Sequence, residues 1–330
     1  MTKIEAADSP AGGRRLLALD AARGLALVAM FVFHIVWDLG FFGLIPAEWP
    51  VDPGFRAYGH GIAASFIALA GIGLVLAARQ KPGWRPALLR IGRIALAAAA
   101  ISAVTYVIFP DEFIFFGILH LIAFAGLCAL PFLRAPAFVV AGVALVALVL
   151  PLFVAAPVFD QPLFWWLGLG TDAPRSNDWR PFLPWFGVML AGLLLGRQIL
   201  SRGLPGRMDC WQPAGLFSRG LVWGGRHSLL VYLVHQPIFI AVIFVIAKMA
   251  GPQHVMGGDP FTQACEAQCV KANGQPGYCK RVCGCIVQQA QAHNLWRAVL
   301  ANKLSDDERV RFTDLTRTCA RFEADGGAPP

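Results

Sequence analysis

Charged residues are scarce in this chain of 330 residues. Asp, Glu, Lys and Arg make up 15% of it, whereas hydrophobic residues make up 57% and the mean hydropathy is +0.58. A soluble chain of this length carries roughly a quarter charged residues, so the composition excludes an ordinary soluble globular protein and is typical of a membrane protein.

Several motifs of soluble enzymes are also missing. The chain has no G-x-x-x-x-G-K-[ST] phosphate loop, no G-x-S-x-G nucleophile turn and no H-E-x-x-H zinc motif. These absences exclude P-loop nucleotide hydrolysis, α/β-hydrolase chemistry and zinc-protease chemistry. The stretch AGIGLVLA, residues 70–77, lies inside an apolar run, where its glycines favour close packing of helices.

Long apolar runs dominate the first 250 residues. About twenty residues in a helix cross ~30 Å of hydrocarbon at 1.5 Å per residue, and the runs have about this length. They predict an all-α, multi-pass membrane bundle of about seven spans, at 17–40, 58–78, 89–109, 113–133, 137–156, 182–200 and 228–249. The first run lacks a small-residue cleavage site after a short apolar core, so we interpret it as a retained span rather than a signal peptide.

Basic residues gather in alternate connections between the predicted spans. With the amino terminus in the cytoplasm, the inner connections hold most of the Arg and Lys, and the outer ones hold Arg56, Arg175 and Arg180 among many acids. This positive-inside bias predicts a cytoplasmic N-terminal segment (1–16), a bundle (17–249) and an extracytoplasmic tail (250–330). The bias also accounts for most of the net charge of +8, so a nucleic-acid partner is not indicated.

Cysteine is rare in the bundle and frequent in the tail. Six of the eight cysteines follow residue 250: Cys265, Cys269, Cys279, Cys283, Cys285 and Cys319. Two pairs are four residues apart, so on helices each pair shares one face, and NGQPG between them favours a turn. One pairing that fits is a helical hairpin joined by Cys265–Cys283 and Cys269–Cys279, with Cys285 bonded to Cys319.

Other interpretations of the cysteines stay open. Six cysteines allow fifteen pairings, and structural zinc is the competing use. Disulfides are favoured because the charge rule places the tail outside the cytoplasm, in an oxidising compartment, and we predict no metal. Cys128 and Cys210 are expected to be free thiols.

Ionisable residues inside the predicted spans are costly and mark either a site or a structural contact. His34, Asp38, His60 and His120 fall in the outer half of the membrane, and His235, just before Pro237, falls nearer the middle. His34 and Asp38 are four residues apart on one helix face, where a carboxylate can orient an imidazole as a general base. The alternative is a helix–helix contact without catalysis.

Basic residues near the inner surface form a second set. Arg90 and Arg93, in LLRIGRI, lie on adjacent positions of the third predicted helix. Paired guanidinium groups bind phosphates, although headgroup anchoring is the simpler use. Asp20 and Arg23, in LDAARG, are expected to form a local ion pair.

Six motifs occur in order: LDAARGLALVAMFVFHIVWDL, SFIALAGIGLVLA, LLRIGRI, FFGILHLI, PFLPWFGVMLAGLLLGR and GRHSLLVYLVHQP. Together they resemble bacterial members of the heparan-alpha-glucosaminide N-acetyltransferase-like family of transmembrane acyltransferases, over roughly residues 15–237. The tail lies outside this resemblance.

The resemblance implies an enzyme that takes an acyl group from cytoplasmic acetyl-CoA and passes it to a saccharide or glycan on the other face of a bacterial inner membrane. It implies CoA binding by Arg23, Arg90 and Arg93. For the general base it leaves two candidates, His34 and His60. His34 oriented by Asp38 would deprotonate the acceptor, and His120 would polarise the acyl carbonyl.

Three other functions remain alternatives. The histidines and Asp38 could serve a transporter, although no internal repeat is seen. Histidines at similar depth could bind haem in a redox protein. The tail could be the functional part, binding a periplasmic partner or a second copy of the chain, with the bundle as its membrane anchor.

Overall fold

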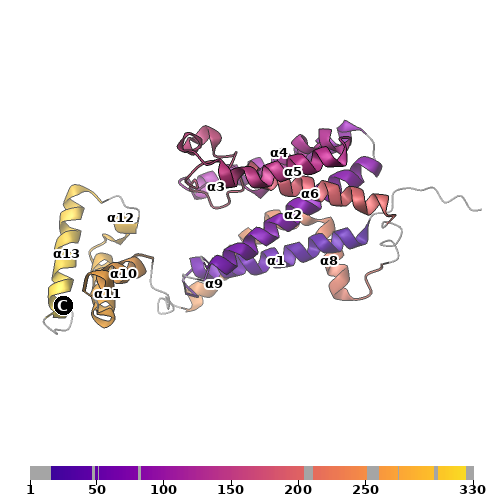
Figure 1. The fold of residues 1–330 in the computed structure, drawn as a ribbon. Coiled ribbons are helices and arrows are strands. Elements are labelled where there is room, and N and C mark those ends of the chain that lie inside the picture. The colour runs from indigo at the N-terminus through magenta and orange to yellow at the C-terminus, as the bar shows by residue number, and fades with distance from the viewer. Residues whose placement is uncertain are drawn as a thin grey trace, which may run out of the picture. The chain divides into compact units, whose positions relative to one another are not determined.

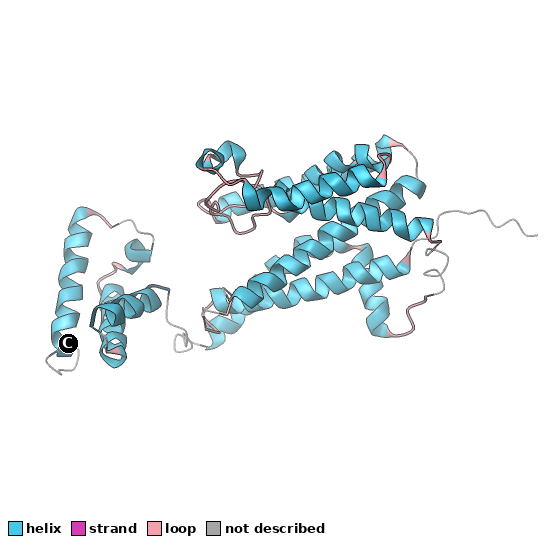
Figure 2. Ribbon diagram, in the orientation of Figure 1, coloured by secondary structure: helices cyan, strands magenta, loops and turns pink. Residues whose placement is uncertain are grey.

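The computed structural model describes residues 16–46, 49–50, 52–80, 83–203, 211–250, 260–273, 275–300 and 304–324. Within these residues every element of regular secondary structure is a helix (Figure 2), which confirms the predicted all-α fold. All but the last residue of the predicted cytoplasmic segment (1–16), and Cys210, lie outside the described residues. Cys128 is a half-buried free thiol, as expected.

Five described helices are long and apolar enough to cross a membrane: α1 (Leu17–Phe41), α2 (Pro53–Gln80), α3 (Trp84–Ile108), α6 (Phe182–Ser201) and α9 (Ser228–Ala250). Their sequences coincide with five of the predicted spans. A helix satisfies its own backbone hydrogen bonds, which the interior of a bilayer requires. The membrane nature of the chain is therefore confirmed.

The other two predicted spans form shorter apolar helices, α4 (Ile118–Ala129) and α5 (Ala137–Phe153). Residues 113–117 were expected to begin α4 but form a loop, because side chains of α3 bind its backbone. The Ser102 hydroxyl donates to the Ile114 carbonyl at 2.6 Å, and the Ile114 N–H donates to Thr105 Oγ1 at 3.1 Å. At the other end Pro131 follows α4 and begins a short 3-10 turn.

Sequence reasoning missed one helix, α8 (Leu216–Arg226), in the connection between α6 and α9. It packs on the start of α1, where Gly225 lies against the backbone of Asp20 and Gly24 lies against the backbone of Leu221. Its apolar and polar residues alternate with helical periodicity, but it is too short to stand out as a span.

Contacts divide the chain into two compact units, Met1–His34 with Pro53–Phe239, and Ile35–Asp52 with Ile240–Pro330. The first unit is built around α2, α4, α5 and α6, and Figure 1 shows α5 and α6 side by side. Ile67, Leu121 and Leu190 are fully buried in its core. The predicted domain boundaries at residues 16 and 249 remain a prediction.

Two glycines let α2 and α6 approach closely. A Cβ at Gly71 would collide with the backbone of α6 at Met189 and Leu193, and a Cβ at Gly192 would collide with the backbone of α2 at Ala68. Close approach of backbones through small residues is the usual packing mode of membrane helices, since lipid supplies no hydrophobic force between them. Gly71 thus has the packing role expected of the glycines in AGIGLVLA.

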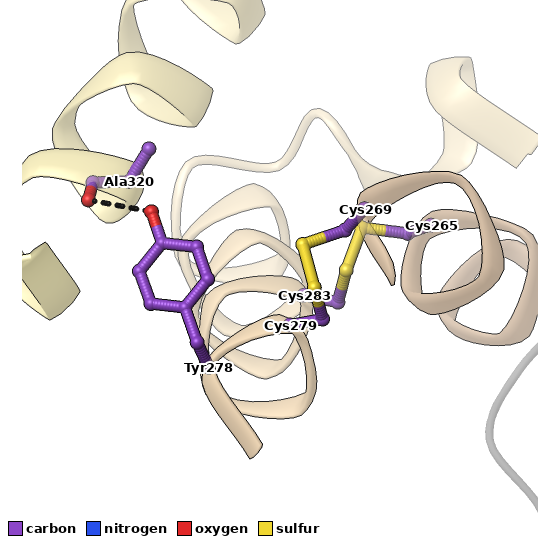
Figure 3. Close-up of a disulfide and its surroundings, with 6 residues drawn as sticks. All are labelled: Cys265, Cys269, Tyr278, Cys279, Cys283 and Ala320. Atoms are coloured by element: carbon purple, nitrogen blue, oxygen red, sulfur yellow. Dashed lines mark hydrogen bonds between the residues drawn. A yellow bond between two sulfur atoms is a disulfide. The ribbon is translucent and has the colours of Figure 1, made fainter. Parts of the chain in front are cut away.

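The cysteine-rich tail belongs to the second unit and contains α10 (Pro260–Asn273), α11 (Pro276–Ala292), α12 (Trp296–Leu300) and α13 (Asp306–Ala324). Disulfides join Cys265 to Cys283 and Cys269 to Cys279 between α10 and α11 (Figure 3), and Cys285 to Cys319 between α11 and α13. The Tyr278 hydroxyl donates to the Ala320 carbonyl at 3.1 Å. The predicted disulfide bonding of the tail is confirmed, with the pairing that fits the hairpin.

Candidate functional site

Arginines from two helices, α1 and α3, converge beside Gly73 of α2. Arg90 of α3 donates from Nη1 to the Gly73 carbonyl at 3.3 Å. A Cβ built on Gly73 would lie 2.7 Å from Nη2 of Arg23 and 3.2 Å from Nη2 of Arg90. The absence of a side chain at Gly73 therefore makes room for two guanidinium groups, so this glycine does not share the packing role of Gly71.

Asp20 links Arg23 to Arg226 of α8. Its carboxylate, with a side chain 3% exposed, lies 3.2 Å from Arg23 Nη1 and 3.5 Å from Arg226 Nε. The expected ion pair of Asp20 with Arg23 is confirmed. Arg23, Arg90, Arg226 and Asp20, here called the arginine cluster, carry two more positive charges than negative ones. Such a cluster suits a polyanionic ligand such as the phosphates of a nucleotide.

Arg93, the other predicted phosphate-binding residue, lies nearly one turn beyond Arg90 on α3 and is exposed. The structure therefore brings Arg23 and Arg90 together at Gly73, and it leaves Arg93 on the surface of α3.

Further along α1, His34 contacts His235 of α9, with ring centroids 4.8 Å apart. We call these two residues the histidine pair. Phe31 stacks on His235 at 5.7 Å, Phe239 meets it edge-on at 5.8 Å, and Phe33 meets His34 edge-on at 5.5 Å. His235 is 5% exposed and His34 is half-buried, and the three phenylalanine rings lie against the pair.

Asp38 lies one turn after His34 on α1 and is 2% exposed. The boundary between the two compact units falls directly after His34, so Asp38 belongs to the second unit. The pairing of Asp38 with His34 remains a prediction.

His120 has both ring nitrogens in hydrogen bonds within the fold. Nδ1 accepts the Gly117 N–H at 3.2 Å, which fixes the ring proton on Nε2, and Nε2 lies 3.0 Å from Ser102 Oγ. The Ser102 hydroxyl proton goes to the Ile114 carbonyl. This chain of bonds caps the start of α4 and holds the 113–117 loop, so it suits a structural role for His120.

His60 is exposed and lies against Trp185 of α6, with ring centroids 5.9 Å apart. The Arg180 guanidinium lies over the same Trp185 ring at 6.0 Å, and its Nε is 3.5 Å from Asp178 Oδ1. Asp178 Oδ2 in turn accepts the Ile118 N–H at 2.8 Å.

A family model described as heparan-alpha-glucosaminide N-acetyltransferase, catalytic, matches residues 15–237, about two-thirds of the chain. The chain belongs to this family. No curated protein and no solved structure matches it. Membership of this N-acetyltransferase family makes the protein a membrane acyltransferase in general terms, and acetyl-CoA is the donor that the family uses. The resemblance seen in the six sequence motifs is confirmed.

The arginine cluster and the histidine pair both lie inside the stretch that matches this acetyltransferase family. Sequence reasoning singled out His34, Arg23 and Arg90, but it missed the convergence of Asp178, Arg180 and Trp185 near His60. The run NDWRP in the long connection before α6 was the available signal, since it places acidic, aromatic and basic side chains together between two apolar spans. His235 was singled out as an ionisable residue nearer the middle of its span, just before Pro237, but not as a partner of His34.

Proposed function

We propose that this acetyltransferase-family protein moves an acetyl or other short acyl group from acyl-CoA at the cytoplasmic face to an acceptor at the outer face. The acceptor we propose is a sugar or amino sugar of a glycan, in the envelope of a bacterium whose inner membrane holds the bundle. The amino terminus lies in the cytoplasm and the cysteine-rich tail lies in the periplasm, because the disulfides need an oxidising compartment.

The observation that carries this proposal is that Arg23 of the arginine cluster and His34 of the histidine pair lie on one helix, α1. Arg23 and His34 are eleven residues apart on α1, about 16 Å along its axis at 1.5 Å per residue. A donor held at Arg23 and Arg90 by its phosphates needs an extended arm to bring a reactive group to His34. Acyl-CoA has this form, with phosphates at one end and a thioester at the other.

The chemistry follows from these positions. His34 takes the proton of the acceptor hydroxyl or amine as the acceptor attacks the acyl carbonyl, and Asp38 orients His34. The thiolate of CoA leaves toward the inner side. Direct transfer needs fewer steps than a covalent acyl-histidine, and His120 supports the site by holding α4 and its loop in place.

The outer groups suit the approach of an acceptor. His60, Trp185 and Arg180 combine an aromatic face with hydrogen-bonding groups near the start of α6, and a sugar ring presents both apolar and hydroxyl surfaces. His60 then contacts the acceptor, and His34 remains the base.

Neither membrane alternative gains support from the geometry. Two axial histidines hold a haem iron from opposite faces of the porphyrin, and the predicted pairs were His34 with His60 or His120. His34 contacts His235 instead, and both ring nitrogens of His120 are in hydrogen bonds within the fold. The transporter alternative does not account for the two arginines, Arg23 and Arg90, beside Gly73.

Oriented membrane vesicles test the proposal. Labelled acetyl-CoA is added outside the vesicles, and amino sugars are enclosed inside them. Inverted vesicles then expose the cytoplasmic face to acetyl-CoA, whereas right-side-out vesicles expose the outer face to it. We expect label in the enclosed amino sugar only in inverted vesicles. If no fraction, including the endogenous glycans, takes up CoA-dependent label, the proposed function is wrong. Transfer in the right-side-out vesicles alone would reverse the proposed orientation.

A further inference from the structure

His235 is a buried histidine that the proposed reaction has not yet used. It lies in α9, is 5% exposed, and contacts Phe31, Phe239 and His34. A histidine placed among aromatic rings loses the hydrogen bonds that water would give it, so each ring nitrogen requires a partner or a function.

The hydrogen bonding of His235 fixes its tautomer. Nδ1 lies 2.6 Å from the Tyr232 carbonyl oxygen. A carbonyl oxygen only accepts, so Nδ1 carries the proton and donates it. Nε2 of the neutral ring then holds a lone pair, and it is buried with no hydrogen-bond partner among the described residues. The structure thus presents a base whose accepting nitrogen is defined.

His34, the other member of the pair, also has a ring nitrogen without a hydrogen-bond partner among the residues that the structure describes. Its Nδ1 is also buried and has no hydrogen-bond partner in the described part of the chain. The two rings are 4.8 Å apart between centroids and 62° apart in plane. Two imidazolium ions this close in apolar surroundings would repel each other strongly, so the pair holds at most one additional proton.

We propose that His34 and His235 act as one proton-accepting unit of the acyl-transfer centre, with Nε2 of His235 as its fixed accepting nitrogen. This inference rests on the proposed function. The acceptor's O–H or N–H bond breaks as its oxygen or nitrogen bonds to the acyl carbon. The C–S bond then breaks with its electron pair on the CoA sulfur, and the unit passes the proton from His34 through His235 to the resulting thiolate.

The alternative is that His235 only packs and bonds the Tyr232 carbonyl. His235→Asn distinguishes this packing role from the proposed role in proton transfer. Its amide nitrogen replaces the Nδ1 donor, while nothing replaces the Nε2 lone pair. His34→Gln and the double variant complete a mutant cycle. Phe239→Leu is the packing control, since Phe239 contacts His235 and carries no nitrogen in its side chain. Each protein is assayed as the full chain for acyl-transfer rate at saturating acetyl-CoA and for equilibrium binding of acetyl-CoA.

We expect each single histidine variant to lower the transfer rate by roughly 10²- to 10⁴-fold, the usual range for loss of general-base catalysis. The double variant should be no slower than the slower single variant, because residues that act as a unit are not additive. Acetyl-CoA binding should stay within about twofold of the starting protein in all variants, which also shows that they fold, and Phe239→Leu should transfer at close to the full rate.

Three results would overturn the inference. The first is a full transfer rate in His235→Asn. The second is a double variant whose loss equals the product of the single losses, which would mean independent roles. The third is a loss in Phe239→Leu as large as that in His235→Asn. A starting protein that transfers nothing would instead count against the proposed function itself.

Discussion

The helical bundle and the cysteine-rich tail differ in the interactions that stabilise each of them. In the bundle, α2 and α6 approach through Gly71 and Gly192 around an extensive apolar core. In the tail, the apolar cluster around Val282 and Ile286 is small, and three disulfides join the helices. The stability of the bundle therefore depends on the size of side chains, whereas that of the tail depends on its redox state.

The largest effect is expected from opening the disulfide between Cys285 and Cys319. It closes a loop with a sequence separation of 34 residues, and loop-closure entropy then contributes about 4 kcal/mol to the free energy of unfolding of the tail. In Cys285→Ser with Cys319→Ser we expect rapid proteolysis within α13, and we expect acyl transfer by the bundle to continue. If transfer stops when only the tail unfolds, the tail and not the bundle carries the function.

The corresponding test of the bundle is Gly71→Ala. Its Cβ would meet the backbone of α6, which cannot move aside as a flexible side chain can, and overpacking of this kind costs about 1–3 kcal/mol. Gly142→Ala in α5 is the matched control, because a Cβ there has no atom within 4 Å. Thermal unfolding in detergent should show a lower midpoint for Gly71→Ala only. Equal midpoints for the two variants would contradict the close crossing of α2 and α6.

A third variant pair separates binding from stability inside the bundle. Arg90→Gln removes the guanidinium that binds the Gly73 carbonyl, and Arg93→Gln removes one from the next turn of the same helix that is not part of the arginine cluster. A charged hydrogen bond contributes about 1.5–3 kcal/mol, so acetyl-CoA should bind Arg90→Gln roughly 10- to 100-fold more weakly. Isothermal titration should find a much smaller change for Arg93→Gln. Equal losses would mean that CoA lies along α3 and not at Gly73.

The smallest effect concerns pH and the long connection before α6. The Thr171 hydroxyl, with the backbone N–H groups of Asp172 and Thr171, holds the pKa of Asp160 below its usual range. A lowered pKa means that this carboxylate stabilises the loop above about pH 4 and ceases to do so as the pH falls through its folded pKa.

Hydrogen exchange of peptides from residues 154–181, corrected for intrinsic rates, should therefore quicken by less than tenfold between pH 6 and pH 3. Asp160→Asn should remove this dependence on pH. Exchange that is the same at both pH values in the starting protein would show that the carboxylate does not hold the loop.

The sequence predicted the parts of this fold that depend on length and composition. Apolar runs of membrane length coincide with α1, α2, α3, α6 and α9. The thickness of the bilayer sets this length, and a helix satisfies its own backbone hydrogen bonds there. The ion pair of Asp20 with Arg23 was also predictable, since residues three apart on a helix are neighbours.

The contacts between helices were not predictable in the same way. Nothing in one helix indicates that His34 meets His235, two hundred residues later, or that Arg90 reaches the carbonyl of Gly73. The 113–117 loop likewise depends on hydroxyls of Ser102 and Thr105 that lie on the preceding helix. Gly71 and Gly73 are two residues apart in one apolar run, yet only tertiary structure distinguishes a packing contact from room for two arginines.

The order of the tail's cysteines has a consequence for how the protein matures. Cys269–Cys279 is nested within Cys265–Cys283, so Cys265 does not bond to Cys269, the next cysteine in the chain. An oxidant that joined cysteines in the order of their synthesis would link Cys265 to Cys269 and produce a mispaired tail. Helices α10 and α11 must therefore align before oxidation, or an isomerase must exchange the bonds afterwards.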